Sequence, residues 1–451
     1  QLTMPGKYEE SIYLLVNPGS GGKMGEQILN RLPNSFEFSL HGGGAAVIRS
    51  FSLIEKDGDR GKKTAFDEIK ALLKINAGPV RVISAGGDGT IKWVVAEAQN
   101  HGVDPEKDLL IGVLPLGTGN DFSRYTGWGG KFPADLLDGE LQNLVALARQ
   151  WCGAKATSHD VWQVKVTVDE DYGAISKVNS KRTRELKKGK VLDETMIMYF
   201  DIGQGSKIGM GFDQRRTTNR HCNNFVYLWE GLKKFLPCRK RHLVADVVDT
   251  MYQGTDSSGE VIFDTDPDSG KPKLKSQPQI LLFINIPSYS GGRADPWRGA
   301  SRLGVTKPLD SGLKKLAQDP GDGNLEVVTM RNPPAVVLDK VLHKLPIFGA
   351  RRVFSGAPIH VEFAWAEDDD LLSYCQVDGE FFKLINPSDV TITPSLKLQV
   401  LRGCGVPADE DDSSEESWSE DEGCSLCPEL FGGDRPSRAS RETRYKQVKK
   451  R

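Results

Sequence analysis

The stretch VRVISAGGDGT, residues 80–90, decides the fold of this chain. It begins with a mostly apolar run that predicts a buried strand, and the glycine-rich loop Gly86–Thr90 follows directly. The same order returns further along, where the apolar run at 109–114 leads into LGTGND at Leu116–Asp121. Glycines at the end of a strand let backbone N–H groups approach an anion closely. Both stretches therefore predict phosphate-binding loops.

A third glycine loop stands near the N-terminus. The apolar run at 11–16 ends in NPGSGGK, residues 17–23, and the apolar residues of 24–32 then recur at helical spacing. A further strand is expected at 46–53, and a helix from Thr64, whose side chain can cap its first turn. Such alternation predicts an α/β domain with a doubly wound, parallel sheet, whose ligands gather beyond the carboxyl ends of the strands. We expect all three loops at that edge.

The character of the sequence changes after Trp151. Short segments of alternating polarity follow, which predict a second, β-rich domain of sandwich type. In the last part of the chain the apolar periodicity ends. Residues 409–422 are acidic and 435–451 are basic, a composition typical of a disordered tail. We therefore divide the chain into a nucleotide-binding domain at 9–155, a second domain at 156–402 and a tail at 403–451.

Composition limits the class of protein. The chain has 451 residues, of which 38% are hydrophobic and 27% charged, as in folded globular proteins. Its net charge of −2 argues against a nucleic-acid-binding protein. The longest apolar runs, such as 280–286, are too short to span a membrane, so contact with a bilayer has to be peripheral. The seven scattered cysteines favour a reducing, cytoplasmic compartment. No signal peptide is visible, although the chain opens with Gln1, which leaves room for a missing N-terminal targeting segment.

An acidic residue inside a phosphate-binding loop points to the chemistry. Asp88 would repel a phosphate, so we expect a metal ion or a reacting hydroxyl group between them. This arrangement indicates phosphoryl transfer. Common motifs do not account for it. The chain has no G-x-x-x-x-G-K-S/T loop, no HRD or DFG set of a protein kinase, and no G-x-S-x-G elbow to accompany the HGGG at 41–44.

Several motifs together carry a family resemblance. In the first domain they are NPGSGG at 17–22, GGDGTIKWV at 86–94, LPLGTGNDFSR at 114–124 and WGG at 128–130. In the second domain they are DVWQV at 160–164, NIPSYSGG at 285–292, GDGNLEVV at 321–328 and QVDGE at 376–380. With these motifs the chain resembles the eukaryotic-type diacylglycerol kinases, within the superfamily that also holds lipid kinases and NAD kinases.

The resemblance implies an enzyme that uses ATP and Mg²⁺ to phosphorylate the free hydroxyl of diacylglycerol at a membrane surface. The product would be phosphatidic acid, and the reaction would shift lipid second-messenger signalling. Sphingosine and ceramide kinases resemble the chain more weakly, which leaves a related lipid kinase for a sphingoid base, ceramide or monoacylglycerol as the alternative. A third hypothesis is a non-catalytic protein that has kept the fold, but the presence of Asp88, Gly89 and Thr118 argues against it.

The three loops supply the candidate site residues. Asp88 is the first candidate for the group that accepts the proton of the lipid hydroxyl, and for the Mg²⁺ ligand. By analogy with related lipid kinases, Asp322 is the second candidate for the base, with Asp88 then organising the metal. Asp121 and Arg124 either position a phosphate or clamp Asp88, or they cap and pair on a helix. The expected nucleotide-binding residues are Asn17, Ser20, Gly21, Gly22, Gly86, Gly87, Gly89, Thr90, Gly117, Thr118, Gly119, Asn120 and, from the resemblance, Glu380.

Two further features concern the second domain and the membrane. The basic segment KKFLPCRKRH at 233–242 and the basic end at 435–451 are candidates for contact with anionic lipid. Where relatives carry an Asp-Ala pair after an Ile-Gly, this chain has Gly205, so a carboxylate is missing there. Asp201 is the nearest substitute, but on a continuous strand it would lie roughly 13 Å away.

Overall fold

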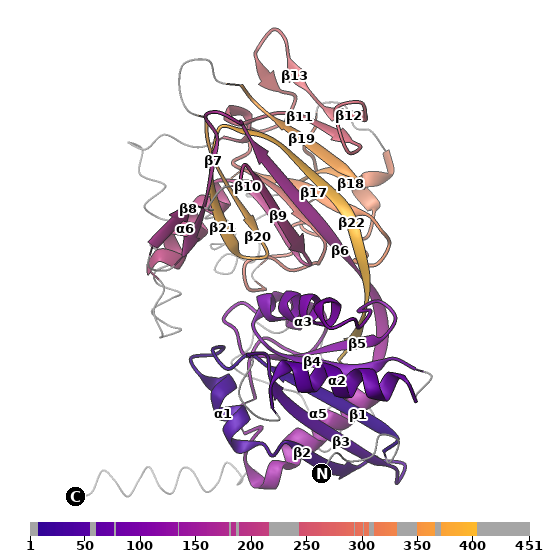
Figure 1. Cartoon of the computed structure of the whole chain (residues 1–451). Coiled ribbons are helices and arrows are strands. Elements are labelled where there is room, and N and C mark those ends of the chain that lie inside the picture. The colour runs from indigo at the N-terminus through magenta and orange to yellow at the C-terminus, as the bar shows by residue number, and fades with distance from the viewer. Residues whose placement is uncertain are drawn as a thin grey trace, which may run out of the picture.

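The computed structural model of this protein describes residues 8–403 except 55–59, 76–77, 134, 180–181, 186–188, 216–242, 293, 301, 306–310, 332–349 and 366–370. Two parts lie one above the other, an α/β part built from the N-terminal residues and a β-rich part (Figure 1). The expected tail, from residue 404 on, and the basic segment 233–242 lie outside the described residues.

The N-terminal part is built on parallel strands. β1 lies at its centre and pairs in parallel with β3 and β4, and β4 pairs in parallel with β5, while β2 joins β3 antiparallel. Its elements are β1 (Glu10–Val16), α1 (Met24–Arg31), β2 (Ser35–Ser39), β3 (Ala45–Ser52), α2 (Lys62–Leu73), β4 (Val80–Gly86), α3 (Asp88–Asn100), β5 (Leu109–Pro115), α4 (Asp121–Tyr125), η1 (Gly139–Leu141) and α5 (Gln142–Gly153).

Helices cover both faces of this sheet. Side chains of β1 alternate between the two faces, so that Leu14 packs with the apolar side chains of α1 and α5, and Leu15 packs with those of α2 and α3. The predicted α/β fold is therefore confirmed. One detail was wrong. The helix expected from Thr64 already begins at Lys62, and no side chain caps it, because Gly61 stands at the cap position.

The second part is a β-sandwich. Apolar side chains of β6, β11, β19 and β22 face those of β10, β15, β17, β18, β20 and β21 across one core, which contains Trp162, Phe200 and Phe283. This confirms the predicted β-rich domain. Its elements are β6 (Lys155–Val168), β7 (Ala174–Asn179), β8 (Arg182–Glu185), β9 (Val191–Met196), β10 (Tyr199–Gly203), α6 (Gln204–Arg215), η2 (Val244–Asp246), β11 (Val248–Gln253), β12 (Glu260–Phe263), β13 (Thr265–Asp266), β14 (Lys271–Pro272), β15 (Ile280–Ile284), β16 (Arg302–Leu303), η3 (Ser311–Lys315), β17 (Leu325–Met330), β18 (Arg351–Gly356), β19 (Ile359–Phe363), β20 (Leu372–Val377), β21 (Glu380–Ile385) and β22 (Pro387–Arg402).

Two long antiparallel strands join the parts. β6 and β22 pair along most of their length, and both extend across the junction, β6 from the N-terminal part into the sandwich and β22 in the opposite direction (Figure 1). The first half of β22 pairs with β19 of the sandwich, whereas Gln399 and Val400 near its end pair in parallel with β5. One sheet therefore continues through both parts of the molecule. The division at residue 155 stays a prediction, and the two strands are the structural link across it.

Candidate active site

The three glycine loops lie against one another beyond the carboxyl ends of β1, β4 and β5, as the sequence predicts. A Cβ atom added to Gly21 would lie 2.8 Å from the carbonyl oxygen of Leu116, and one added to Gly117 would lie 2.7 Å from the Cα of Gly87. Such short distances leave no room for side chains between the loops. The glycines therefore serve loop packing, which brings three sets of backbone N–H groups to one edge of the sheet.

Some loop residues face open space instead. An added Cβ at Gly22 or Gly89 would have no atom within 4 Å, and both residues are exposed. Gly119 lies between the two parts, with its Cβ position 3.4 Å from Asp88 Oδ2 and 3.8 Å from the Cα of Gly291. These positions are where a bound phosphate could come close to backbone N–H groups.

Other candidates hold the loops in shape. The buried Asn120 donates from Nδ2 to the carbonyl oxygens of Gly117 (2.9 Å) and Gly130 (3.0 Å), and its backbone is left-handed with φ of 55°. Thr90 is buried, and its Oγ1 accepts a hydrogen bond of 3.5 Å from Asn17 Nδ2. Ser20 donates its backbone N–H to the carbonyl oxygen of Asn17, and Thr118 is partly exposed in the second loop.

Asp88 is the first residue of α3 and points into the edge where the loops meet. Its Oδ2 accepts the backbone N–H of Asp121 at 3.2 Å and its Oδ1 accepts that of Phe122 at 3.1 Å. Asp88 as a whole is partly exposed to solvent. Burial, followed by the negative charge of Asp121, raises the pKa of Asp88 to about 7. At neutral pH Asp88 is therefore able to take up a proton or to face a cation.

Asp121 links the N-terminal part to the sandwich. Its buried carboxylate accepts the backbone N–H groups of Gly291 (2.8 Å) and Gly292 (2.7 Å) and the hydroxyl of Ser288. The hydroxyl of Tyr199 donates to its Oδ2 at 3.3 Å. Four donors, all from the second domain, thus converge on a residue whose own backbone N–H binds Asp88. The sequence left the role of Asp121 open, and this geometry favours fixing the Asp88 loop over contacting a phosphate directly.

Arg124 lies beside the same junction. Its Nε donates to the carbonyl oxygen of Gly119 at 3.4 Å. A Cβ on Gly130 would lie 2.0 Å from Arg124 Cζ, and one on Gly292 would lie 2.6 Å from its Cδ, so both glycines make room for this side chain. Gly292 belongs to the sandwich, which means that Arg124 also packs between the two parts.

Asp322 and Glu380 both belong to the sandwich. Asp322 is exposed in a turn, where its Oδ1 accepts the N–H of Asn324 at 2.8 Å, and none of the contacts described for Asp88 involves it. Glu380 begins β21 and forms an ion pair of 2.6 Å with Lys177 of β7. The structure therefore brings Asp88 and Asp121 together and places Asp322 in a separate turn.

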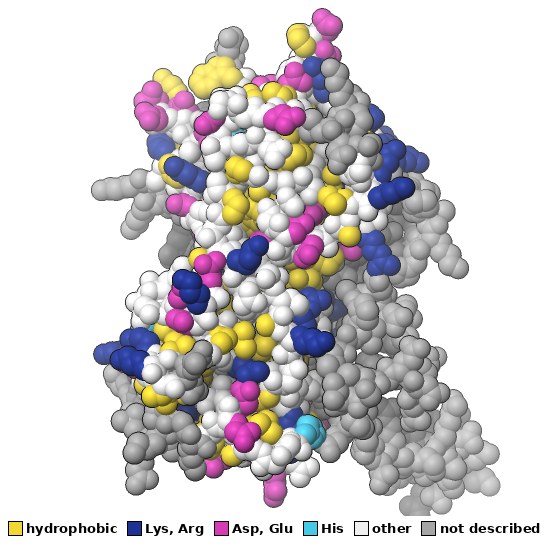
Figure 2. Space-filling model, turned by 90° about the vertical axis from the view of Figure 1, so that its right-hand side faces the viewer, with side chains coloured by type: hydrophobic (Ala, Val, Ile, Leu, Met, Phe, Trp, Pro, Cys, Tyr) yellow, Lys and Arg dark blue, Asp and Glu magenta, His cyan; other side chains and the backbone are white. Residues whose placement is uncertain are grey.

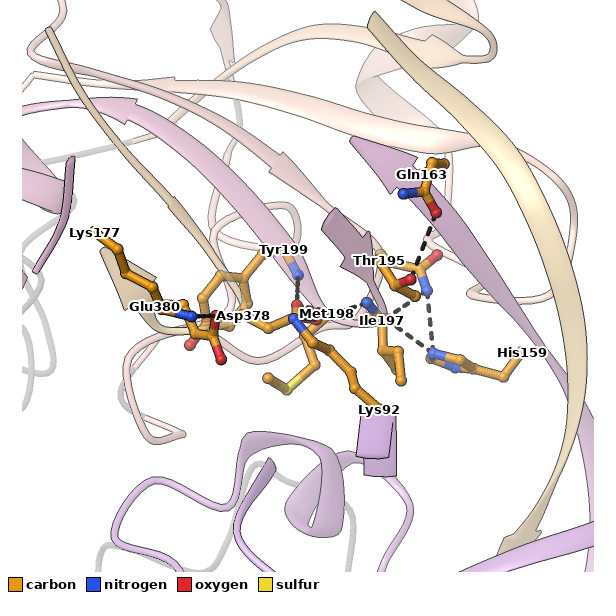
Figure 3. A network of polar contacts seen from close by, with 11 residues as sticks. Lys92, His159, Gln163, Lys177, Thr195, Ile197, Met198, Tyr199, Asp378 and Glu380 are labelled. Atoms are coloured by element: carbon orange, nitrogen blue, oxygen red, sulfur yellow. Dashed lines mark hydrogen bonds and ion pairs between the residues drawn. The ribbon is translucent and has the colours of Figure 1, made fainter. Parts of the chain in front are cut away.

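Asp378 was not among the predicted site residues, although it precedes Gly379 and Glu380 in the QVDGE motif. Its buried carboxylate accepts the backbone N–H groups of Ile197, Met198 and Tyr199 at 2.8, 2.8 and 3.0 Å (Figure 3). Lys92 of α3 reaches it from the N-terminal part, with 3.8 Å between Nζ and Oδ2. Burial raises the pKa of Asp378, and the charge of Lys92 opposes that rise. The motif itself was the only signal in the sequence.

The expected distance between Asp201 and Gly205 was wrong. The strand β10 ends at Gly203 and α6 begins at Gln204, so the chain turns back. A Cβ added to Gly205 would lie only 3.4 Å from Asp201 Oδ1. Asp201 is fully buried and accepts hydrogen bonds from Ser206, Tyr289 and Gln376. A carboxylate is thus present beside Gly205, but donors from its own domain already surround it.

Two further properties concern the part of the chain that the structure describes. Within it, no three side chains of His, Cys, Asp or Glu gather in a way that would hold a metal ion by themselves. Over the same residues, no helix is both long and apolar enough to cross a bilayer.

Comparisons with known proteins agree with this architecture. The family model of the diacylglycerol kinase catalytic domain matches residues 11–147, and that of the diacylglycerol kinase accessory domain matches residues 195–381, together more than half of the chain. The eye-specific diacylglycerol kinase of Drosophila melanogaster is 27% identical over 68% of this chain and 18% of its own length. The probable diacylglycerol kinase 3 of Caenorhabditis elegans is 27% identical over 78% of this chain and 40% of its own length. Diacylglycerol kinase 4 of Arabidopsis thaliana is 24% identical over 83% of this chain and 77% of its own length.

The chain spans less than half the length of the first two of these relatives. Both domain models lie in the order in which the structure places the α/β part and the sandwich. The glycine loops with Asp88 fall inside the catalytic match, and the residues that bind Asp121 fall inside the accessory match. On these grounds, the chain belongs to the diacylglycerol kinase family.

Proposed function

We propose that this protein transfers the γ-phosphoryl group of ATP to the hydroxyl of diacylglycerol and so forms phosphatidic acid. The observation that carries the proposal is the meeting of three glycine loops at Asp88, in a chain whose two parts match the catalytic and accessory domains of one lipid kinase family. A new bond forms between the hydroxyl oxygen and the γ-phosphorus, and the bond from that phosphorus to the leaving oxygen of ADP breaks.

The nucleotide would be held mainly by backbone groups. Gly22 and Gly89 leave open space at the loop edge, and α3 begins there at Asp88, so that its N-terminus lies at the same edge. Charge on a phosphoryl group in transfer spreads over its oxygens, so that N–H groups fixed in advance lower the barrier without covalent chemistry. Thr90 and Asn120 keep those groups fixed.

Asp88 is the proposed acceptor of the hydroxyl proton. A carboxylate with a pKa of about 7 is ionised in a large fraction of molecules at neutral pH and still attracts a proton strongly. The exposed position of Asp322, in a turn of its own, favours Asp88 over the second candidate.

Mg²⁺ fits the site only in a limited way. Asp88 keeps unused lone pairs and some open surface, and Mg²⁺ in kinases is held by one or two carboxylates together with substrate phosphates and water. Bound there, Mg²⁺ would neutralise charge on the phosphates. Asp121 is a poor ligand, because four donors of the second domain already occupy its oxygens.

Diacylglycerol lies in a bilayer, so the protein is proposed to act at a membrane surface in the cytoplasm. Charge is unevenly spread on the face drawn in Figure 2, where Lys and Arg side chains gather along one side of the sandwich. Anionic headgroups attract surfaces of this kind. The segments 233–242 and 435–451 remain proposed lipid contacts outside the described residues.

A mixed-micelle assay with labelled ATP tests the proposal. Diacylglycerol, monoacylglycerol, sphingosine and ceramide are offered at equal surface concentration, with and without phosphatidylserine. We expect labelled phosphatidic acid from diacylglycerol, and more of it with phosphatidylserine. Label in a sphingoid product but not in phosphatidic acid would favour the alternative lipid kinase. No label in any lipid, with Asp88 intact and the protein folded, would contradict the proposal.

A further inference from the structure

A closed circuit of contacts connects α3 to the sandwich and returns to α3. Its first half runs through the N-terminal part. Asp88, at the start of α3, accepts the backbone N–H of Asp121 at 3.2 Å. The carboxylate of Asp121 in turn accepts the hydroxyl of Tyr199 at 3.3 Å. Asp88 is thereby joined, through one intervening residue, to the first residue of β10.

The second half of the circuit runs through the hairpin of β20 and β21. The backbone N–H of Tyr199 donates to Asp378 at 3.0 Å, and Asp378 lies at the turn of this hairpin. Lys92 of α3 approaches Asp378 to 3.8 Å (Figure 3). Because Lys92 stands four residues after Asp88, both side chains project from the same face of α3. The circuit therefore begins and ends on one helix turn.

The environment of Lys92 singles it out within the circuit. Its Nζ atom is buried and makes no hydrogen bond within the described part of the chain. A buried ammonium group is costly unless a carboxylate lies close to it, and Asp378 fills that need. The other charged groups that act on this cluster are Glu194 of β9 and the Lys177–Glu380 pair, from the sandwich. Lys92 is thus the cation that α3 contributes to an interface with several carboxylates.

We infer that Lys92 is a positioning residue, which holds the β20–β21 hairpin against α3 and thereby keeps Tyr199, Asp121 and Asp88 in register. This inference rests on the proposed kinase activity. Loss of the ammonium group leaves Asp378 buried without its partner, so the hairpin shifts away from α3. The turn at 197–199 follows Asp378, and the support of Asp121 by Tyr199 weakens. Asp88 then loses its fixed orientation, whereas the loop backbone that would hold ATP stays in place.

Steady-state kinetics on the full chain tests the inference, with ATP and diacylglycerol micelles. We expect Lys92→Met to lower kcat about tenfold with KM for ATP changed less than about twofold, the pattern of an interaction that matters in the transition state. Lys92→Arg keeps the positive charge and recovers at least half of the loss on a logarithmic scale. Lys62→Met is the matched control. Lys62 of α2 forms an ion pair of 2.6 Å with Glu97 of α3, the helix that carries Lys92, but it lies outside the circuit. It should leave kcat within about twofold of wild type.

A double-mutant cycle distinguishes a circuit from a general loss of stability. If Lys92 acts through Tyr199, then Lys92→Met combined with Tyr199→Phe lowers kcat little further than the larger single change. The inference would be overturned if the fold-losses in kcat of the two single variants multiplied in the double variant. It would also be overturned if Lys92→Arg were as slow as Lys92→Met. Thermal unfolding corrects each rate for the folded fraction. A wild-type protein that phosphorylates no lipid would instead refute the proposed function, so the two failures can be told apart.

Discussion

Asp88 and Asp378 are both carboxylates held by backbone N–H groups, yet their surroundings differ. Asp88 receives two such groups and stays partly open to solvent, and the charges that act on it most strongly are the negative ones of Asp121 and Asp378. Asp378 receives three, is buried, and has Lys92 beside it. The charges that act most strongly on Asp88 are therefore negative and the residue is partly exposed, whereas Asp378 is buried with a positive charge beside it. In the proposed mechanism the N-terminal side of the junction offers the reactive group, and the accessory side fixes its geometry.

Removal of the Asp88 carboxylate tests the reactive side and has the largest expected effect. Asp88→Ala should lower turnover at least about a hundredfold, since both proton acceptance and any contact with a cation are lost. The measurement is initial rate of phosphatidic acid formation in mixed micelles at saturating ATP. Asp322→Asn is the comparison, and its exposed turn leads us to expect a loss below about tenfold. A reversed order of the two variants would move the base to Asp322.

Local sequence signals were enough to predict the reactive side. An apolar run followed by glycines marks a strand and its loop, and parallel strands bring such loops to one edge, so Gly87 and Gly117 could be expected to meet. The accessory side offered no such signal. Asp378 accepts the backbone N–H of Met198, which lies 180 residues away along the chain, and this contact exists only because β10 and β20 pair in the sandwich.

The Asp201–Gly205 error has a related cause. A strand pattern gives no warning of where the strand ends, and α6 starts directly after β10. Side-chain distances estimated along an extended chain then fail, because the backbone turns at Gly203, whose φ is 117°, and brings Gly205 back beside Asp201. Contacts between distant segments, and the last residue of a strand, were therefore the parts of this site that sequence patterns left open.

A pH titration of stability probes the enclosed side. His159 of β6 is fully buried, and its Nε2 contacts the carbonyl oxygen of Ile197, next to the turn that Asp378 holds. Burial lowers the pKa of His159 to about 4. Its neutral form therefore contributes stability that is present above pH 6.5 and is lost as the pH falls from there toward 4. Between pH 7 and pH 5 the free energy of unfolding should drop by about 2 kcal/mol through this residue.

Urea unfolding of wild type and His159→Gln at both pH values measures that contribution. Glutamine does not titrate, and its amide can still donate to the carbonyl oxygen of Ile197. Between pH 7 and pH 5 the free energy of unfolding of the variant should therefore fall by about 2 kcal/mol less than that of wild type, whatever the stability of the variant at pH 7. Equal pH slopes in the two proteins would mean that His159 becomes protonated in the folded state without cost, and the junction would then be more open than the structure indicates.

Two glycine substitutions separate packing from binding on the reactive side, with the smallest expected effects. Gly117→Ala adds a Cβ at 2.7 Å from Gly87, so the two loops have to move apart, and we expect a lower melting temperature and about tenfold lower kcat/KM. Gly89→Ala adds a Cβ where nothing lies within 4 Å, in the first turn of α3, so the fold should be unaffected or slightly stabilised.

Gly89→Ala tests where the nucleotide binds. A methyl group in open space harms activity only if the substrate needs that space, so Gly89→Ala should raise KM for ATP about threefold while KM for diacylglycerol and the melting temperature hold. An unchanged KM for ATP would place the nucleotide away from the first turn of α3. The effect of Gly117→Ala would then report loop packing alone, and the accessible face of Asp88 would have to be assigned to the lipid.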